Sequence, residues 1–199
     1  MLWRWAARGE RMTISFDGFV LRAATPADIP SITALIDASV RGLSQAHYSP
    51  EEIEESLVTV FGVDSQLITD GTYYVIECNG ALAASGGWGK RATLYGGDQV
   101  KQTADPLLDP ATDAARIRAF YVSPLFARRG LARRLYHACE LNAVAAGFRR
   151  FQLGATLPGV PLYESLGFRA VRDVPTTMRH GLTLGIVQME RAIPSTGAT

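Results

Sequence analysis

Residues 116–146 read RIRAFYVSPLFARRGLARRLYHACELNAVAA, and this stretch decides the fold. The run of mainly apolar residues up to Val122 predicts a buried strand. Pro124 ends that strand, because proline has no N–H to donate to a sheet. From Leu131 onward, apolar residues recur every three or four positions, which predicts an amphipathic helix. The stretch therefore predicts a strand, a tight turn and a helix in succession.

The turn between this strand and helix is suited to binding an anion. Gly130 stands at the start of the helix, where a glycine lets a ligand approach the backbone. The unpaired amides and the positive end of the helix dipole face such a ligand. Four arginines add full positive charges: Arg128, Arg129, Arg133 and Arg134. The turn is therefore predicted to hold a pyrophosphate.

Composition indicates one ordinary domain. The chain has 199 residues, of which 47% are hydrophobic and 20% charged, enough for a full core. We expect a single domain at 19–193, an N-terminal extension at 1–18 that need not be ordered, and a tail at 194–199. The net charge of +1 gives no case for nucleic acid or a membrane as partner. Residues 116–172 are strongly basic and the remainder is acidic, which fits either a cationic substrate or scattered surface charge.

Targeting signals and metal motifs are not found in the sequence. The N-terminus lacks the apolar run of a signal peptide, and no stretch is long and apolar enough to span a bilayer. We therefore expect a cytoplasmic protein, whose true start is Met1 or Met12. Cys78 and Cys139 are interpreted as small core residues of a reducing compartment rather than a disulfide. The cysteines and histidines lack ligand spacing, so no metal site is predicted.

The remaining elements follow from local patterns. Thr25 and Ser49 are predicted to cap two helices. Asn79-Gly80 predicts the turn of a hairpin between 72–78 and 81–88. A long loop at 89–114 precedes the opening stretch, and after it come a strand at 149–155, a short helix at 162–166 and closing strands at 168–174 and 184–191. The predicted fold class is α+β, in three layers, with a mixed, mainly antiparallel sheet and helices on both faces.

With these elements in order, the chain resembles the GCN5-related N-acetyltransferase (GNAT) superfamily from about Val20 to Glu190. The resemblance rests on Val122-Ser123-Pro124 followed by Gly130-Leu131-Ala132, and on the stretch LYESLGF at 162–168. It implies the GNAT, or acyl-CoA N-acyltransferase, fold with a splayed central strand pair. It also implies acetyl-CoA as the acyl donor.

The resemblance implies a set of donor-binding residues. The pyrophosphate would lie on the turn, and the pantetheine arm on the splayed strand, with Thr156 as a further contact. The cofactor-binding residues expected in this way are Phe120, Tyr121, Val122, Arg128, Arg129, Gly130, Leu131, Ala132, Arg133 and Thr156. The first Arg/Gln position of the family motif is Ala127 here, and the neighbouring arginines are expected to compensate.

The sequence indicates the catalytic residues less directly than the cofactor-binding residues. Tyr163 matches the family tyrosine that protonates the departing CoA thiolate, although it could instead be a core aromatic. Arg116 stands where some members carry a glutamate base. His47 is the candidate base best suited by its ordinary pKa, the alternative being a surface histidine. The other candidates are Tyr48, Glu51, Glu77, Asp98 and Asp113. A backbone amide near Tyr121 or Val122 is the expected oxyanion donor, and Trp88 either lines the acceptor pocket or fills the core.

The leading functional hypothesis is an acetyl-CoA-dependent N-acetyltransferase that acts directly on a primary amine of a small molecule. The alternative is a non-catalytic acyl-CoA-binding regulatory module. A phosphate-loop nucleotide-binding protein is excluded, because no Gly-x-x-x-x-Gly-Lys-Ser/Thr motif occurs. A homodimer is left open, and the loop at 89–114 is expected to determine the acceptor.

Overall fold

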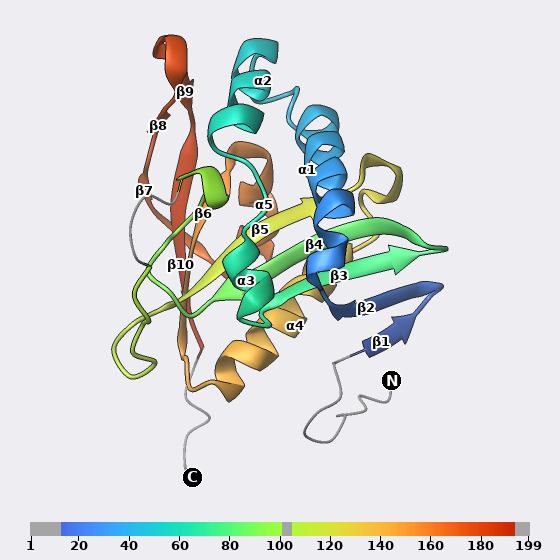
Figure 1. Cartoon of the computed structure of the whole chain (residues 1–199). Helices are drawn as coiled ribbons and strands as arrows, with labels where there is room; N and C mark the ends of the chain where they lie inside the picture. Colours follow the sequence, from blue (N-terminus) through green and yellow to red (C-terminus); the bar gives the residue numbers. More distant parts are fainter. Residues whose placement is uncertain (1–12, 101–104, 194–199) are drawn as a thin grey trace.

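The computed structural model describes residues 13–100 and 105–193, so parts of the predicted extension and tail lie outside it. An eight-stranded sheet runs through the molecule, with helices on both faces (Figure 1). The elements in chain order are β1 (Thr13–Phe16), β2 (Phe19–Ala23), α1 (Ile29–Leu43), α2 (Pro50–Thr59), α3 (Ser65–Thr69), β3 (Tyr73–Cys78), β4 (Ala81–Gly89), β5 (Ala115–Val122), α4 (Leu131–Ala145), β6 (Arg150–Thr156), α5 (Val160–Ser165), β7 (Arg169–Asp173), β8 (Thr176–Thr177), β9 (Thr183–Leu184) and β10 (Ile186–Ala192).

The sheet has the order β1-β2-β3-β4-β5-β6-β10-β7. Its named strand pairs are antiparallel except β5 and β6, which run parallel at its centre. This confirms the predicted mixed, mainly antiparallel sheet. The predicted closing strands are also confirmed, because β10 lies between β6 and β7 and pairs with both.

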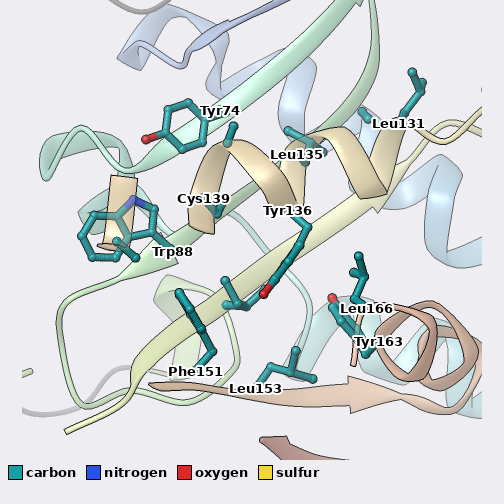
Figure 2. Close-up of a cluster of buried hydrophobic side chains, with 14 of the residues drawn as sticks. Tyr74, Trp88, Leu131, Leu135, Tyr136, Cys139, Phe151, Leu153, Tyr163 and Leu166 are labelled. Carbon is teal, nitrogen blue, oxygen red and sulfur yellow. The ribbon is translucent and has the colours of Figure 1, made fainter. Parts of the chain in front are cut away.

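Two cores form on the two faces of the sheet, and strand β3 shows how. Tyr73 and Val75 belong to the cluster under α1, α2 and α3, whereas Tyr74 and Ile76 belong to the cluster under α4. Successive side chains of a strand point to opposite faces, so one buried strand serves both cores. Figure 2 shows part of the cluster on the α4 side.

The predicted Ser49 cap and the predicted hairpin are present, whereas the Thr25 side chain makes no capping hydrogen bond. Ser49 and Glu52 form a capping box at the start of α2, in which the Glu52 amide donates to Ser49 Oγ at 3.2 Å. The hairpin turn has Asn79 and Gly80 at φ of +50° and +80°, as a two-residue turn of this type requires. Thr25 precedes a short 3-10 turn, Pro26–Asp28, that leads into α1.

Four short elements were not predicted. β1 lies inside the expected extension and pairs with β2, so the ordered sheet begins at Thr13 rather than Phe19. α3 is five residues long, too short to show a helical period, and Asp64 caps it. β8 and β9 form a small separate hairpin between β7 and β10. The turn between β1 and β2 is Asp17-Gly18, with φ of +44° and +79°, a local hairpin signal from which β1 could have been predicted.

Candidate active site at the splayed strands

The central feature of the site is the separation of β5 from β6. The two strands are paired only through Ala115 with Phe151 and Arg116 with Gln152. Beyond these pairs they diverge, and a pocket of about 230 Å³ opens along the remainder of β5. The predicted splayed pair is therefore present, and residues from Ile117 to Val122 line the pocket.

A bulge in β5 shapes the wall of this pocket. Tyr121 is paired with Ser85 and Arg118 with Gly87, so two residues of β5, Ala119 and Phe120, face one residue of β4. Ala119 has a φ of +54°, in the left-handed region. The opposing residue is Gly86, where a Cβ would stand 2.4 Å from Cδ1 of the Phe120 ring. The bulge and Gly86 together place the Phe120 ring.

The turn before α4 has the geometry of an anion site. Gly130, at φ +76°, is the N-cap of α4, and Arg128 also has a positive φ of +64°. The first backbone hydrogen bond of the helix runs from the Arg134 amide to the Gly130 carbonyl, at 3.1 Å. The amides of Leu131, Ala132 and Arg133, in the first turn of the helix, therefore have no acceptor within the helix and are available to a ligand. Arg128 and Arg129 are exposed beside them.

Two further arginines of the turn make side-chain contacts. Arg133 Nη2 donates to Ser165 Oγ at 2.9 Å, which joins α4 to α5. Arg134 forms an ion pair with Asp17 at 3.2 Å. Leu131 is buried, so its side chain anchors the helix start while its amide stays in the turn. Ala132, one residue on, lines the pocket.

Tyr163 lies on α5 and lines the same pocket. Its ring contacts Phe168 at 5.7 Å and Phe120 at 6.4 Å between centroids, and Figure 2 shows it beside Leu166 in the core cluster. No described residue bonds its hydroxyl, and burial raises the pKa of that hydroxyl well above its usual value. The Tyr163 ring thus packs in the core, and its protonated hydroxyl is available at the pocket.

A second tyrosine of the pocket shares these properties. Tyr121 packs edge-on against Phe61, with centroids 6.3 Å apart, and burial also raises the pKa of its hydroxyl. The next residue, Val122, donates its amide to Ser39 Oγ at 3.2 Å. The Val122 amide expected as an oxyanion donor is therefore already bonded to a serine, and Ser39 itself lines the pocket.

The structure does not bring His47 to the pocket. Its side chain is exposed and is not among the lining residues. Its neighbour Tyr48 is buried and has a structural contact instead: its hydroxyl donates to the Gly185 carbonyl at 2.6 Å and accepts from the Leu157 amide at 2.8 Å. Thr156, by contrast, lies at the end of β6 and does line the pocket.

The other candidate bases also lie away from the pocket. Glu51 is exposed on α2. Glu77 is paired with Arg22. Asp98 accepts from the Ser65 amide at 3.1 Å, and Asp113 from the Asp109 amide at 2.8 Å. Glu77, Asp98 and Asp113 therefore each contact another part of the chain rather than the pocket.

Trp88 and Arg116 likewise are not among the residues that line the pocket. Trp88 packs edge-on against Phe148, 5.9 Å between centroids, as a core residue. Arg116 is half-buried where β5 and β6 are still paired, and its side chain bonds Gln152. The position of the family's glutamate thus lies beside the closed part of the strand pair.

Arg118 is a site residue that sequence reasoning missed. It is only 3% exposed, and its guanidinium donates to Asp64 Oδ2 at 2.8 Å, to the Thr93 carbonyl at 2.7 Å and to the Gly96 carbonyl at 2.6 Å. These bonds fasten the loop after β4 to β5 and to the start of α3. A buried arginine in a strand is itself a signal, because it must have partners.

Metal-ligand groups and membrane-spanning helices are both missing from the described residues. No group of three or more His, Cys, Asp or Glu side chains in that part of the chain could hold a metal ion. None of its helices combines the length and the apolar character that crossing a bilayer demands.

Comparison with known proteins agrees with this geometry. Residues 109–192 match the sequence family described as the acetyltransferase (GNAT) domain. This segment includes the splayed strand, the turn, α4 and α5. This part of the chain is therefore similar to the GNAT acetyltransferase domain. No match was found among curated proteins.

Solved structures show the GNAT fold over most of the chain. A GCN5-related N-acetyltransferase from Rhodopseudomonas palustris has a TM-score of 0.65 at 18% identity, covering 90% of this chain and 99% of that one. A putative acetyltransferase from Salmonella typhimurium, solved with its cofactor acetyl-CoA, has a TM-score of 0.58 at 18% identity, covering 91% and 97%. A ribosomal-protein-alanine N-acetyltransferase from Brucella melitensis has a TM-score of 0.57 at 16% identity, covering 87% and 99%.

Proposed function

We propose that this protein is an acetyl-CoA-dependent N-acetyltransferase that moves the acetyl group directly to a primary amine of a small molecule. One observation carries the proposal: the amides of the turn at Gly130 open beside a pocket that runs along the splayed strand to Tyr163. A ligand with an anionic head and a narrow arm fits this arrangement. The acetyl-CoA complex of the Salmonella typhimurium neighbour supports the choice of ligand.

The residues present fit such a donor. The free amides and exposed arginines of the turn would hold the pyrophosphate. The unpaired edge of β5 offers backbone groups to an amide-bearing arm, as an added strand would use them. Bound acetyl-CoA supplies the thioester. In the net reaction the amine nitrogen bonds to the acetyl carbon, the C–S bond breaks, and the proton that the amine loses balances the one gained by the CoA thiol.

We assign Tyr163 to the leaving group. An ordinary thiol has a pKa of about 8.5, below that of a phenol, and burial raises the Tyr163 pKa further. Full proton transfer from Tyr163 to the thiolate is therefore uphill. The hydroxyl acts as a hydrogen-bond donor that stabilises the negative charge as it develops on sulfur. Positioning of amine and thioester supplies the remaining acceleration.

The alternative, a regulatory module that binds acyl-CoA without chemistry, has one observation in its favour. No carboxylate or histidine is found among the residues that line the pocket, so within the described chain no strong base faces the amine. Under the proposal, the amine loses its proton to water before it attacks. The acetyltransferase would release CoA thiol when an amine is present, and the regulatory module would not.

The experiment follows release of CoA thiol from acetyl-CoA with a panel of primary amines. We expect release that depends on both protein and amine, and a loss of about one hundredfold in kcat with Tyr163→Phe at nearly unchanged acetyl-CoA affinity, the range for a general acid or charge-stabilising donor. Tyr121→Phe is the matched control, a second buried phenol of the same pocket. Tight acetyl-CoA binding with no thiol release from any amine would favour the regulatory module.

The cytoplasm remains our proposed location. Both cysteines are free, which is usual in a reducing compartment. Cell fractionation tests this location, and labelling of the free thiols in intact and in lysed cells tests whether the cysteines stay reduced.

A further inference from the structure

The end of the pocket farthest from the turn has a lining of its own. The donor end, beside the turn, includes Val122 and Ala132. Arg118 lies four residues before Val122 on β5, on the other side of the bulge at Ala119 and Phe120. Apart from the donor-end residues, the same pocket is lined by Val60 and Phe61 after α2, by 94–96 of the long loop, and by Arg118. If the donor binds as proposed, this far end receives the acceptor.

Three aromatic rings give this end its shape. Phe61 and Tyr121 meet edge to face. Tyr95 lies over Gly154 of β6, where a Cβ would stand 2.9 Å from the Tyr95 ring, and its hydroxyl accepts from Thr176 Oγ1 at 3.0 Å. The Tyr95 ring is therefore held from both ends. Aliphatic side chains also line the pocket: Val40, Leu43, Val60, Leu94 and Ile186.

Charge is almost missing from this lining. Arg118 is the one charged residue among the described residues that line the pocket. Its guanidinium is already bonded to Asp64 and to two carbonyls, and Asp64 itself is 1% exposed behind it. Neither partner of this pair is free to bind a substrate charge. An acceptor with several ammonium groups would lose hydration here and gain no carboxylate partner, so its binding is disfavoured.

We propose that the acceptor is a primary amine carried on an apolar, ring-sized body, of the arylalkylamine class, and that polyamines and lysine-rich peptides are excluded. The proposal rests on the N-acetyltransferase function above. The aromatic rings provide flat apolar contact for a ring, with the energetic preference of aromatic pairs for edge or offset contact. The uncharged lining favours the neutral form of the amine, which is the form that attacks the thioester.

The test compares kcat/KM for 2-phenylethylamine, ethanolamine and spermidine, measured as CoA thiol release. We expect 2-phenylethylamine to exceed both other amines by at least about tenfold, the discrimination that a few apolar contacts supply. A preference for spermidine would overturn the acceptor class while leaving the acetyltransferase function standing. Failure to bind acetyl-CoA, measured separately by calorimetry, would instead overturn the proposed function.

Two variants test whether the aromatic wall causes the preference for 2-phenylethylamine. Phe61→Ala removes one ring of the wall and should lower kcat/KM for 2-phenylethylamine by about tenfold or more, reducing its advantage over ethanolamine. Val58→Ala is the matched control, because Val58 lies in the last turn of α2, three residues before Phe61, is 58% exposed and does not line the pocket. Acetyl-CoA affinity within twofold of wild type shows that each variant is folded. An unchanged preference in folded Phe61→Ala would contradict the proposal.

Discussion

The Phe120 ring lies so close to Gly86 that a methyl group at position 86 would stand 2.4 Å from its Cδ1 atom. Phe120 belongs to the bulge of β5 and contacts Tyr163, so this one close approach between β4 and β5 determines where the wall of the pocket stands. Glycine at position 86 is thus required by packing rather than by backbone conformation.

Gly86→Ala should therefore displace Phe120 and damage the site. We expect a stability loss of about 1–3 kcal/mol, as for overpacked cores, and a lower acetyl-CoA affinity. Gly89→Ala on the same strand is the control, since a Cβ there meets its neighbours at 3.5 Å or more, an ordinary contact. Urea unfolding and calorimetry measure both effects. Equal behaviour of the two variants would show that Phe120 is not placed by Gly86.

Gly130 gives a test of the turn. Gly130→Ala should cost about 1–2 kcal/mol of stability, because its φ is +76°, and should weaken acetyl-CoA binding by disturbing the amides. Gly18→Ala carries the same backbone penalty at φ +79°, in the turn between β1 and β2, and neither added Cβ meets an atom within 4 Å. Only Gly130→Ala should lose affinity for acetyl-CoA. A similar loss in Gly18→Ala would mean that affinity simply follows stability.

The buried pair of Arg118 and Asp64 should matter far more for stability than a surface pair. Asp64→Ala leaves a guanidinium buried without its carboxylate, and we expect a loss of about 3–5 kcal/mol. Glu54→Ala breaks the pair between Glu54 and Arg41, whose side chains are 59% and 47% exposed, and should cost far less stability because solvent screens the pair. Chemical denaturation of both variants measures the difference. Similar losses would show that the buried pair is no more important than the exposed one.

Acid should destabilise the protein in part through Asp28. The hydrogen bonds from Arg22 hold the pKa of the Asp28 carboxyl well below its usual value. A carboxyl with a depressed pKa stabilises the fold above its unfolded pKa of about 4, and this stability is lost as the pH falls. Asp28→Asn should lower stability at pH 7 by about 1.5–3 kcal/mol and flatten the decline below pH 4. An equally steep acid decline in the variant would assign it to other groups.

Local chemistry made much of the fold predictable. The Asn79-Gly80 turn, the Ser49 cap and the turn at Gly130 each depend on a few adjacent residues, and each is present. The splayed strand pair was implied by the family resemblance, and the register of β5 with β6 confirms it.

The parts that could not be predicted depend on contacts between distant segments. Tyr95 reaches the pocket only because the long loop is fastened by Arg118 to Asp64, residues far apart in the chain. His47 lies in the loop expected to border the acceptor, but proximity in sequence does not determine where a side chain faces, and it is exposed. The sequence likewise did not decide between pocket and core for Trp88, and its contacts with distant apolar residues place it in the core.

The central claim is that the turn and the splayed strands bind acetyl-CoA. Calorimetric titration of the wild-type protein with acetyl-CoA and, separately, with ATP tests it most directly, because both ligands carry phosphates but only acetyl-CoA has an arm for the pocket. The account predicts saturable binding of acetyl-CoA and much weaker binding of ATP. Binding of ATP without binding of acetyl-CoA would contradict it.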